Sequence, residues 1–308
     1  MYPLERSYGQ EAFYAWDENK PPDLSDKQTS PDYANAHTWS VSSFQQLVEA
    51  VAFLGSMNKR LALFYRGQSR DVAPLPALFR NSWCAFDTDK HFEINSTICK
   101  KYWDALFDIG RRVFEICNEP QLGLPRWRGL KGIREVQWAV VQHYGIWPTP
   151  LLDLTSNLRV AASFAMSFAS ATRSNPKTGY LYVSGMPYST GSISYDIDQQ
   201  VVLARLQSAC PPIAKRPHYQ DGFLVGRFPL YEPDHEAAQN SSLIRRLVAK
   251  FQLHDSGEFW NVDFPPISLA ALLPSQDPLR ERLLDEFGAT GSYSVYRLAQ
   301  SFCDADAG

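Results

Sequence analysis

The chain has 308 residues, of which 44% are apolar and 20% are charged, the proportions of an ordinary globular protein with a large core. Its 30 basic and 33 acidic side chains give a formal net charge of −3, which excludes net charge as a source of attraction to nucleic acid or anionic membranes. The N-terminus lacks the pattern of a secretory signal, and no apolar run is long enough to span a bilayer. We therefore expect a cytoplasmic protein without membrane contact.

Cysteine and histidine residues are scattered along the chain. The five cysteines are Cys84, Cys99, Cys117, Cys210 and Cys303. No two of them have the C-x-x-C spacing of a zinc or redox site, and the six histidines are equally dispersed. We therefore expect reduced thiols and no bound metal.

The chain divides into a polar N-terminal extension, residues 1–37, and one domain, residues 38–308. The extension contains several prolines and little apolar periodicity, which is typical of a segment lying on the surface or partly disordered. The domain alternates helical and strand-like patterns, so we expect an α/β fold with a central mixed sheet flanked by helices.

Hydrophobic periodicity and capping residues predict the elements of this domain in chain order. The first helix starts at Ser42 or Ser43 as its N-cap and stops near Gly55. The other predicted helices cover residues 93–119, 133–144, 157–168 and 278–287, and the predicted strands cover 61–65, 151–153, 179–183, 201–206 and 267–273.

Two later segments are less regular. Residues 207–240 contain Cys210, Pro211, Pro212 and Pro217 and are expected to hold a loop excursion, a feature that is often functional. Residues 242–251 fit either a helix or a strand.

Arg66 follows the first predicted strand and precedes Gly67. Guanidinium presents a rigid fork of donors that matches phosphate, and glycine would let a ligand approach the backbone. The alternative is a structural arginine that pairs with a carboxylate such as Asp71 or Asp153.

A dense group of polar and aromatic residues follows between Gln142 and Thr155. His143 and Tyr144 lie at the end of a predicted helix, and Asp153 and Thr155 lie at the end of a predicted strand. These side chains converge on one cleft if the helix and the strand are antiparallel neighbours. The signatures of P-loop enzymes, Rossmann dehydrogenases, zinc proteases and α/β-hydrolases are absent from the sequence.

Four motifs occur in the order typical of the FRG domain family: FYRGQ at 64–68, LPALFR at 75–80, QHYG at 142–145 and PTPLLDLT at 148–155. The chain resembles this family from about residue 38 to 170. Trp147 is one residue extra, and Leu154 and Leu158 stand where the family usually has tryptophan and often has proline. Beyond residue 170 the family usually shows the pattern R-x-x-x-Q-x-G-x-F. At the corresponding spacings this chain has Arg246, Lys250, Gln252 and His254, so only the arginine agrees with the pattern.

The family is similar to ADP-ribosyltransferase-like folds, so the resemblance implies NAD as a substrate. On this interpretation Arg66 clamps the pyrophosphate, Tyr144 stacks on nicotinamide, and Asp153 orients His143 or Arg66, binds a ribose hydroxyl, or only neutralises an arginine. The expected NAD-contacting residues also include Gly67, Gln68, Arg80, Thr149 and Thr155. A late acidic role would fall to Glu236 or Glu258, unless these are exposed turn residues.

The family's members are similar to toxin and phage-defence components. The resemblance therefore implies an NAD-using ADP-ribosyltransferase or glycohydrolase that acts on an intracellular macromolecule, with an antitoxin or defence partner. The alternative is a non-catalytic module of the same fold that senses a nucleotide or nucleic acid. That module would bind phosphate through Arg66, Arg80, Arg245 and Arg246 and stack bases on aromatic side chains.

Overall fold

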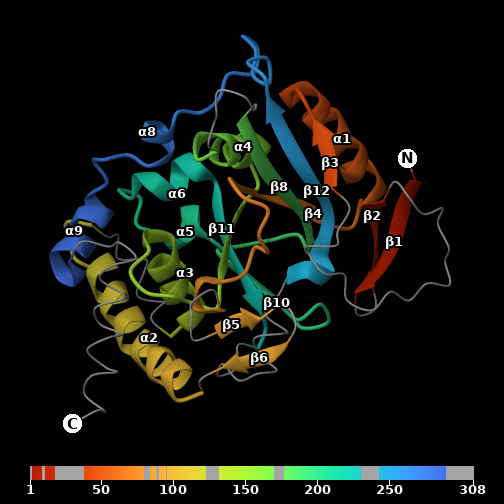
Figure 1. The fold of residues 1–308 in the computed structure, drawn as a ribbon. Coiled ribbons are helices and arrows are strands. Elements are labelled where there is room, and N and C mark those ends of the chain that lie inside the picture. The colour runs from red at the N-terminus through yellow and green to blue at the C-terminus, as the bar shows by residue number, and fades with distance from the viewer. Residues whose placement is uncertain are drawn as a thin grey trace.

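A computed structural model gives the fold of the chain (Figure 1). The structure describes residues 2–8, 11–17, 38–79, 84–87, 90–94, 96–122, 132–169, 177–229 and 243–288. Arg80 and Glu236 lie outside these residues. Within the described residues, no helix combines the length and the hydropathy needed to cross a membrane.

A mixed sheet of eight strands forms the centre of the molecule, in the order β3-β12-β8-β4-β7-β11-β10-β9. β3 and β12 are parallel, and all other neighbouring pairs are antiparallel. The strands are β3 (Thr38–Val41), β4 (Ala62–Gln68), β7 (Leu152–Thr155), β8 (Lys177–Met186), β9 (Ile193–Asp196), β10 (Val201–Arg205), β11 (Gly222–Arg227) and β12 (Leu247–Asp255). The predicted α/β fold with a central mixed sheet is confirmed.

Helices pack against this sheet, with α1 beside β3 and with α2 and α3 near its other end (Figure 1). The helices are α1 (Phe44–Met57), α2 (Ser96–Cys117), α3 (Arg134–Tyr144), α4 (Leu158–Ser167), α5 (Leu206–Ala209), α6 (Lys215–Gln220), α8 (Leu269–Leu272) and α9 (Pro278–Phe287). Two short hairpins, β1 (Tyr2–Tyr8) with β2 (Glu11–Asp17) and β5 (Cys84–Asp87) with β6 (Lys90–Ile94), and two 3-10 turns, η1 (Ala77–Phe79) and η3 (Leu243–Arg246), complete the described elements.

The capping residues act as the sequence predicts. The Ser43 hydroxyl accepts from the backbone N–H of Gln46 at 3.2 Å, and the Asn157 side chain accepts from two N–H groups of the first turn of α4. Gly145 ends α3 in the left-handed region at a φ of 67°, where glycine avoids the steric cost of a Cβ atom. One boundary differs, because α1 continues beyond Gly55 to Met57.

The structure differs from the sequence predictions in the later third of the chain. Within the range 207–240, expected to hold a loop excursion, the chain forms α6 and β11, and residues 230–240 lie outside the described part. The predicted strand at 267–273 is wrong, because the Ser268 hydroxyl accepts from the N–H of Ala271 and starts the short helix α8. The sequence left residues 242–251 as either a helix or a strand. The second half of this segment belongs to strand β12, residues 247–255. The hairpin β1–β2 lies within residues 1–37, and the boundary between extension and domain stays a prediction.

The helices pack mainly on one face of the sheet. Tyr65 pairs with Thr155, which pairs with Gly222, so these three side-chain positions share a face. On that face one apolar cluster lies beneath α1 and α4, and a second joins α2, α3 and α9 to β10 and β11. A third cluster, which includes Phe64 and Leu154, occupies the opposite face. The border between the first two clusters is where the candidate site lies.

Candidate functional site

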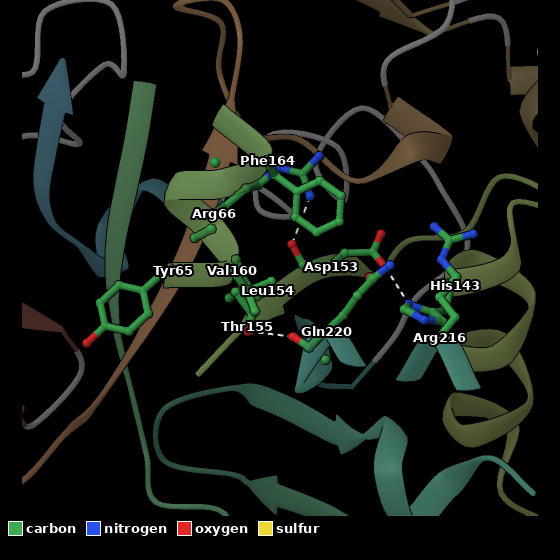
Figure 2. Close-up of a pocket in the computed structure, with 13 residues that line it drawn as sticks. Tyr65, Arg66, His143, Asp153, Leu154, Thr155, Val160, Phe164, Arg216 and Gln220 are labelled. Atoms are coloured by element: carbon green, nitrogen blue, oxygen red, sulfur yellow. Dashed lines mark hydrogen bonds and ion pairs between the residues drawn. The ribbon is translucent and has the colours of Figure 1, made fainter. Parts of the chain in front are cut away.

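A pocket opens at this border, where β4 and β7 diverge (Figure 2). Among the described residues of these two strands, Tyr65 and Thr155 are the only ladder pair. The pocket has a volume of about 220 Å³, below the roughly 300–1,000 Å³ of most ligand pockets, so it has room for a small molecule or for one part of a larger one. Its walls are formed by Tyr65, Arg66, Gly67, His143, Asp153, Leu154, Thr155, Val160, Ala161, Phe164, Arg216, Gln220 and Gly222.

Arg66 joins the two diverging strands. Its Nη1 donates to the backbone carbonyl of Asp153 at 2.8 Å, and its Nε donates to the side-chain oxygen of Gln68 at 3.0 Å. Asp71, one of its predicted carboxylate partners, pairs instead with Lys250 at 2.7 Å. Arg66 thus fixes the mouth of the pocket and brings a positive charge to its β4 wall (Figure 2).

His143 and Asp153 form a pair on the opposite wall. Nδ1 of His143 lies 3.4 Å from Oδ1 of Asp153, and the amide of Gln142 donates to Oδ2 at 3.1 Å. Burial alone would raise the pKa of Asp153. The hydrogen bonds from His143 and Gln142 and the charge of Arg66 hold that pKa well below its usual range. Asp153 is therefore an ionised carboxylate, and its side chain is 35% exposed.

The His143 ring is almost fully enclosed, with 2% of its side chain exposed. Burial lowers its pKa, and although Asp153 opposes this effect, the charge of Arg216 adds to it. The ring is therefore neutral at pH 7. Its Nε2 is buried and has no hydrogen-bond partner in the described part of the chain. A neutral imidazole with Nδ1–H directed at a carboxylate presents a free lone pair at Nε2.

Thr155 and Gln220 close the floor of the pocket through structural hydrogen bonds. The Thr155 hydroxyl donates to the carbonyl of Gln220 at 2.7 Å and accepts from the N–H of Asn157 at 3.0 Å. The Gln220 amide donates to the carbonyl of Leu272 at 2.7 Å. These contacts fix α6 and α8 against the end of β7.

Helix α4 supplies an apolar wall that lies very close to the sheet. A Cβ atom on Gly67 would lie 1.8 Å from the carbonyl oxygen of Ala161. The packing of α4 therefore requires glycine at position 67. The sequence had suggested a different reason for this glycine, namely that it lets a ligand approach the backbone. Phe164, one turn farther along α4, contributes an aromatic ring to the pocket and lies parallel to Phe168, with ring centroids 6.4 Å apart.

Five of the predicted site residues line this pocket: Arg66, Gly67, His143, Asp153 and Thr155. Tyr144 does not line it. Its ring packs in the helical core, and its hydroxyl donates to Oδ2 of Asp277 at 3.1 Å. Gln68 accepts from Arg66 and donates to the carbonyl of Val72, and Thr149 is fully buried and donates to Gln142.

The remaining candidates lie elsewhere. Glu258 is exposed and does not line the pocket. Arg246 is 2% exposed and donates to Gln199 and to the carbonyl of Gly185. The side chain of Arg245 is not among those described. Of the four arginines of the sensing hypothesis, Arg66 therefore lines the pocket and Arg246 does not, whereas Arg80 and the side chain of Arg245 lie outside the part of the chain that the structure describes.

Sequence reasoning missed Phe164, Arg216 and Gln220. Phe164 belongs to an apolar helical stripe that indicates core packing, and nothing in that pattern distinguishes the ring at the pocket. Arg216 and Gln220 lie in the range 207–240, which was expected to be a functional excursion. The folded helix α6 brings them to the end of β7.

No group of three or more histidine, cysteine or acidic side chains is arranged to hold a metal ion within the described ranges. Cys117 and Cys210 are buried free thiols. Burial, with the nearby charge of Glu119, raises the pKa of Cys117 to about 12, and burial raises the pKa of Cys210 well above its usual value. Neither thiol is suited to nucleophilic chemistry.

Comparison with known families gives a match over part of the chain. Residues 61–174 match the family model described as the FRG domain. This range contains β4, α3, β7 and α4, the elements that carry Arg66, His143, Asp153 and Phe164. No curated protein matches the chain. No solved structure matches it.

Proposed function

With an FRG domain over residues 61–174 as the premise, we propose that the chain cleaves the nicotinamide–ribose bond of NAD and transfers the ADP-ribosyl group to water or to a macromolecular acceptor. The observation that carries this proposal is the His143–Asp153 pair at the wall of a small pocket, with an ionised carboxylate and an unpartnered imidazole nitrogen. An ADP-ribosyltransferase-like relationship is part of the proposal.

The carboxylate suits the first half of this reaction. The bond between C1′ of ribose and nicotinamide nitrogen breaks, and both bonding electrons leave with nicotinamide, which departs as a neutral ring. The ribose carbon becomes positively charged and shares that charge with the ring oxygen. A fixed carboxylate beside this centre stabilises it, because opposite charges attract strongly in a poorly solvated site. Asp153 is the ionised group of the pocket that can take this role.

The imidazole suits the second half. An acceptor hydroxyl or water forms a bond to C1′ and releases its proton to Nε2 of His143, which acts as a general base. Because Nε2 is buried, this step requires a shift of the ring or of its neighbours that brings Nε2 into contact with the acceptor. Asp153 stabilises the resulting imidazolium through Nδ1. The low pKa of buried His143 keeps Nε2 unprotonated at neutral pH, as this step requires.

The rest of the pocket supports binding. Arg66 carries positive charge at the β4 wall, where it attracts the diphosphate of NAD. Phe164 offers an aromatic face for stacking the nicotinamide ring, the role that the sequence suggested for Tyr144. The volume of about 220 Å³ accommodates the reacting end of NAD and leaves the adenosine outside.

The acceptor and its biological setting extend the same proposal. The similarity of the family to toxin and phage-defence components supports a macromolecular target and a partner that restrains the activity. The test is to incubate the purified chain with NAD, alone and with RNA, DNA or protein from a cell extract. Release of nicotinamide and the fate of ADP-ribose are followed by mass spectrometry.

We expect nicotinamide release that Asp153→Asn abolishes. Asp263→Asn is the matched control, because Asp263 is exposed and outside the pocket, and it keeps the activity. NAD binding without any release, with every acceptor class, would contradict catalysis and favour the nucleotide-sensing alternative.

A further inference from the structure

Arginines that are buried or partly buried in this chain differ in how their guanidinium groups are satisfied. Arg246 donates to the side chain and the backbone carbonyl of Gln199 at 2.8 and 2.6 Å. Arg282 forms ion pairs with Glu119 at 2.8 Å and with Glu286 at 3.0 Å. These arrangements compensate the loss of water around a positive charge.

The side chain of Arg216 is satisfied differently. Across the ranges that the structure describes, its side chain makes no hydrogen bond and no ion pair, and its Nε is buried without a partner. Burial also lowers its pKa, an effect that the charges of Asp153 and Asp277 partly offset. Arginine stays protonated at neutral pH, so the pocket contains an incompletely solvated cation.

The backbone around Arg216 is nevertheless held firmly. Its N–H donates to Oδ2 of Asp277 at 2.8 Å, and its guanidinium lies 5.9 Å from the ring centre of Tyr144. Asp277 is fully buried and caps α9 through Oδ1, which accepts from the N–H groups of Leu279 and Arg280. The side chain of Arg216 is therefore placed in the pocket by a rigid support.

The other groups of the pocket leave Arg216 available. Asp153 is the ionised carboxylate of the pocket, and it already accepts from Gln142 and faces Nδ1 of His143. Nε2 of His143 is a hydrogen-bond acceptor in its neutral form and carries no negative charge. A largely enclosed guanidinium whose donors meet no hydrogen-bond acceptor is costly, and a ligand with a phosphate group would supply that acceptor.

We propose that Arg216 is a phosphate-binding residue of this pocket. It donates through its guanidinium fork to a phosphate oxygen of a nucleotide diphosphate. The inference rests on the proposed function in one respect only, which is that the diphosphate belongs to NAD. It assigns to α6 a ligand-binding role that the motifs of residues 61–174 do not contain.

Calorimetric titration with ADP-ribose tests this role, because ADP-ribose has the diphosphate of NAD but no nicotinamide bond to cleave. We expect Arg216→Gln to weaken ADP-ribose binding about tenfold or more, the scale of a charged hydrogen bond. Arg159→Gln is the matched control, because it removes the same charge from an exposed position of α4 beside the pocket. This control should bind within about twofold of the wild-type protein. Adenosine, which has no phosphate, should bind equally to all three proteins.

Thermal stability separates a ligand-binding arginine from a structural one. Without ligand, Arg216→Gln should melt at the same temperature as the wild-type protein or higher, because it removes a largely enclosed charge whose side chain has no hydrogen bond or ion pair among the described residues. Excess ADP-ribose should raise the melting temperature of the wild-type protein and of Arg159→Gln, but much less that of Arg216→Gln.

Three results would overturn the assignment: equal ADP-ribose affinity of Arg216→Gln and wild type, the same loss in Arg159→Gln, or no ADP-ribose binding by the wild-type protein at millimolar concentration. These outcomes are separate from the fate of the proposed reaction. If ADP-ribose binding depends on Arg216 but no nicotinamide is released from NAD, the catalytic proposal fails and the phosphate site stands.

Discussion

Nδ1 of His143 lies 3.4 Å from Oδ1 of Asp153, although the first residue belongs to the last turn of α3 and the second to β7. The intervening turn begins with Gly145 in the left-handed region and reverses the chain, so that the end of the helix faces the strand. This relationship places a neutral base and an ionised carboxylate on one wall of the pocket. It also makes the stability of the fold sensitive to acid.

We predict that the free energy of unfolding decreases as the pH falls below about 6.5, the ordinary pKa of histidine. Because burial lowers the pKa of His143 in the folded state, the unfolded chain binds a proton that the folded chain excludes. The contribution of His143 to the unfolding free energy is fully present above pH 6.5. Below pH 6.5 the unfolding free energy decreases by up to about 1.4 kcal/mol per pH unit. Asp153, whose folded pKa is also lowered, adds a similar loss only below about pH 4.

Urea titrations at pH 7.0, 6.0 and 5.0 measure this dependence. His143→Gln should flatten the slope between pH 6.5 and 5, whereas His218→Gln, which changes an exposed histidine of α6, should keep it. An unchanged slope in His143→Gln would show that His143 is not the group responsible.

Gly67→Ala should destabilise the fold by about 1–3 kcal/mol or more, since its Cβ atom would overlap the carbonyl oxygen of Ala161 and push α4 from the sheet. Gly132→Ala is a suitable comparison because nothing lies within 4 Å of its Cβ position. Chemical denaturation of both variants tests the packing role. A fully stable Gly67→Ala protein with weakened NAD binding would instead support the ligand-approach role that the sequence suggested.

Arg66→Lys should affect stability and binding together. Lysine cannot donate at once to the carbonyl of Asp153 and to Gln68, so we expect a loss of about 1 kcal/mol in unfolding free energy. Under the proposed function, NAD affinity also falls, because the fork at the β4 wall is lost. Arg111→Lys, at an exposed position of α2, controls for the substitution. An Arg66→Lys protein of wild-type stability would contradict the strand-joining role.

Tyr144→Phe should lower the unfolding free energy by about 1–2 kcal/mol, because the buried hydroxyl donates to the carboxylate of Asp277. It should leave NAD binding unchanged, since Tyr144 is not a pocket residue. Tyr219→Phe, an exposed change on α6, should alter neither property. Phe164→Ala should show the reverse pattern of Tyr144→Phe, with weaker NAD binding and a smaller change in melting temperature. Reduced NAD affinity in Tyr144→Phe would restore the stacking role.

Local signals predicted much of the fold and part of the site. Ser43 and Asn157 as caps and Gly145 as a helix end fix boundaries through short-range hydrogen bonds and backbone sterics, so they can be read from the sequence. The convergence of His143 and Asp153 was predictable because both lie within one helix–turn–strand unit.

The remaining features depend on contacts between distant segments. Arg216 reaches the pocket because α6 packs at the end of β7, through the hydrogen bond of Thr155 to Gln220, 65 residues away. Tyr144 leaves the pocket because Asp277, 133 residues away, accepts its hydroxyl. Neither partnership has a periodic or motif signal, so a single sequence does not disclose it.

The most direct test of the central claim is the steady-state kinetics of nicotinamide release from NAD by the wild-type protein, Asp153→Asn and His143→Gln. We expect measurable release by the wild-type protein, with kcat reduced at least about 100-fold in both variants. Direct NAD titration should show that each variant retains its affinity within about threefold. Release that continues at the wild-type rate in either variant would contradict the assignment of this pair to the chemistry.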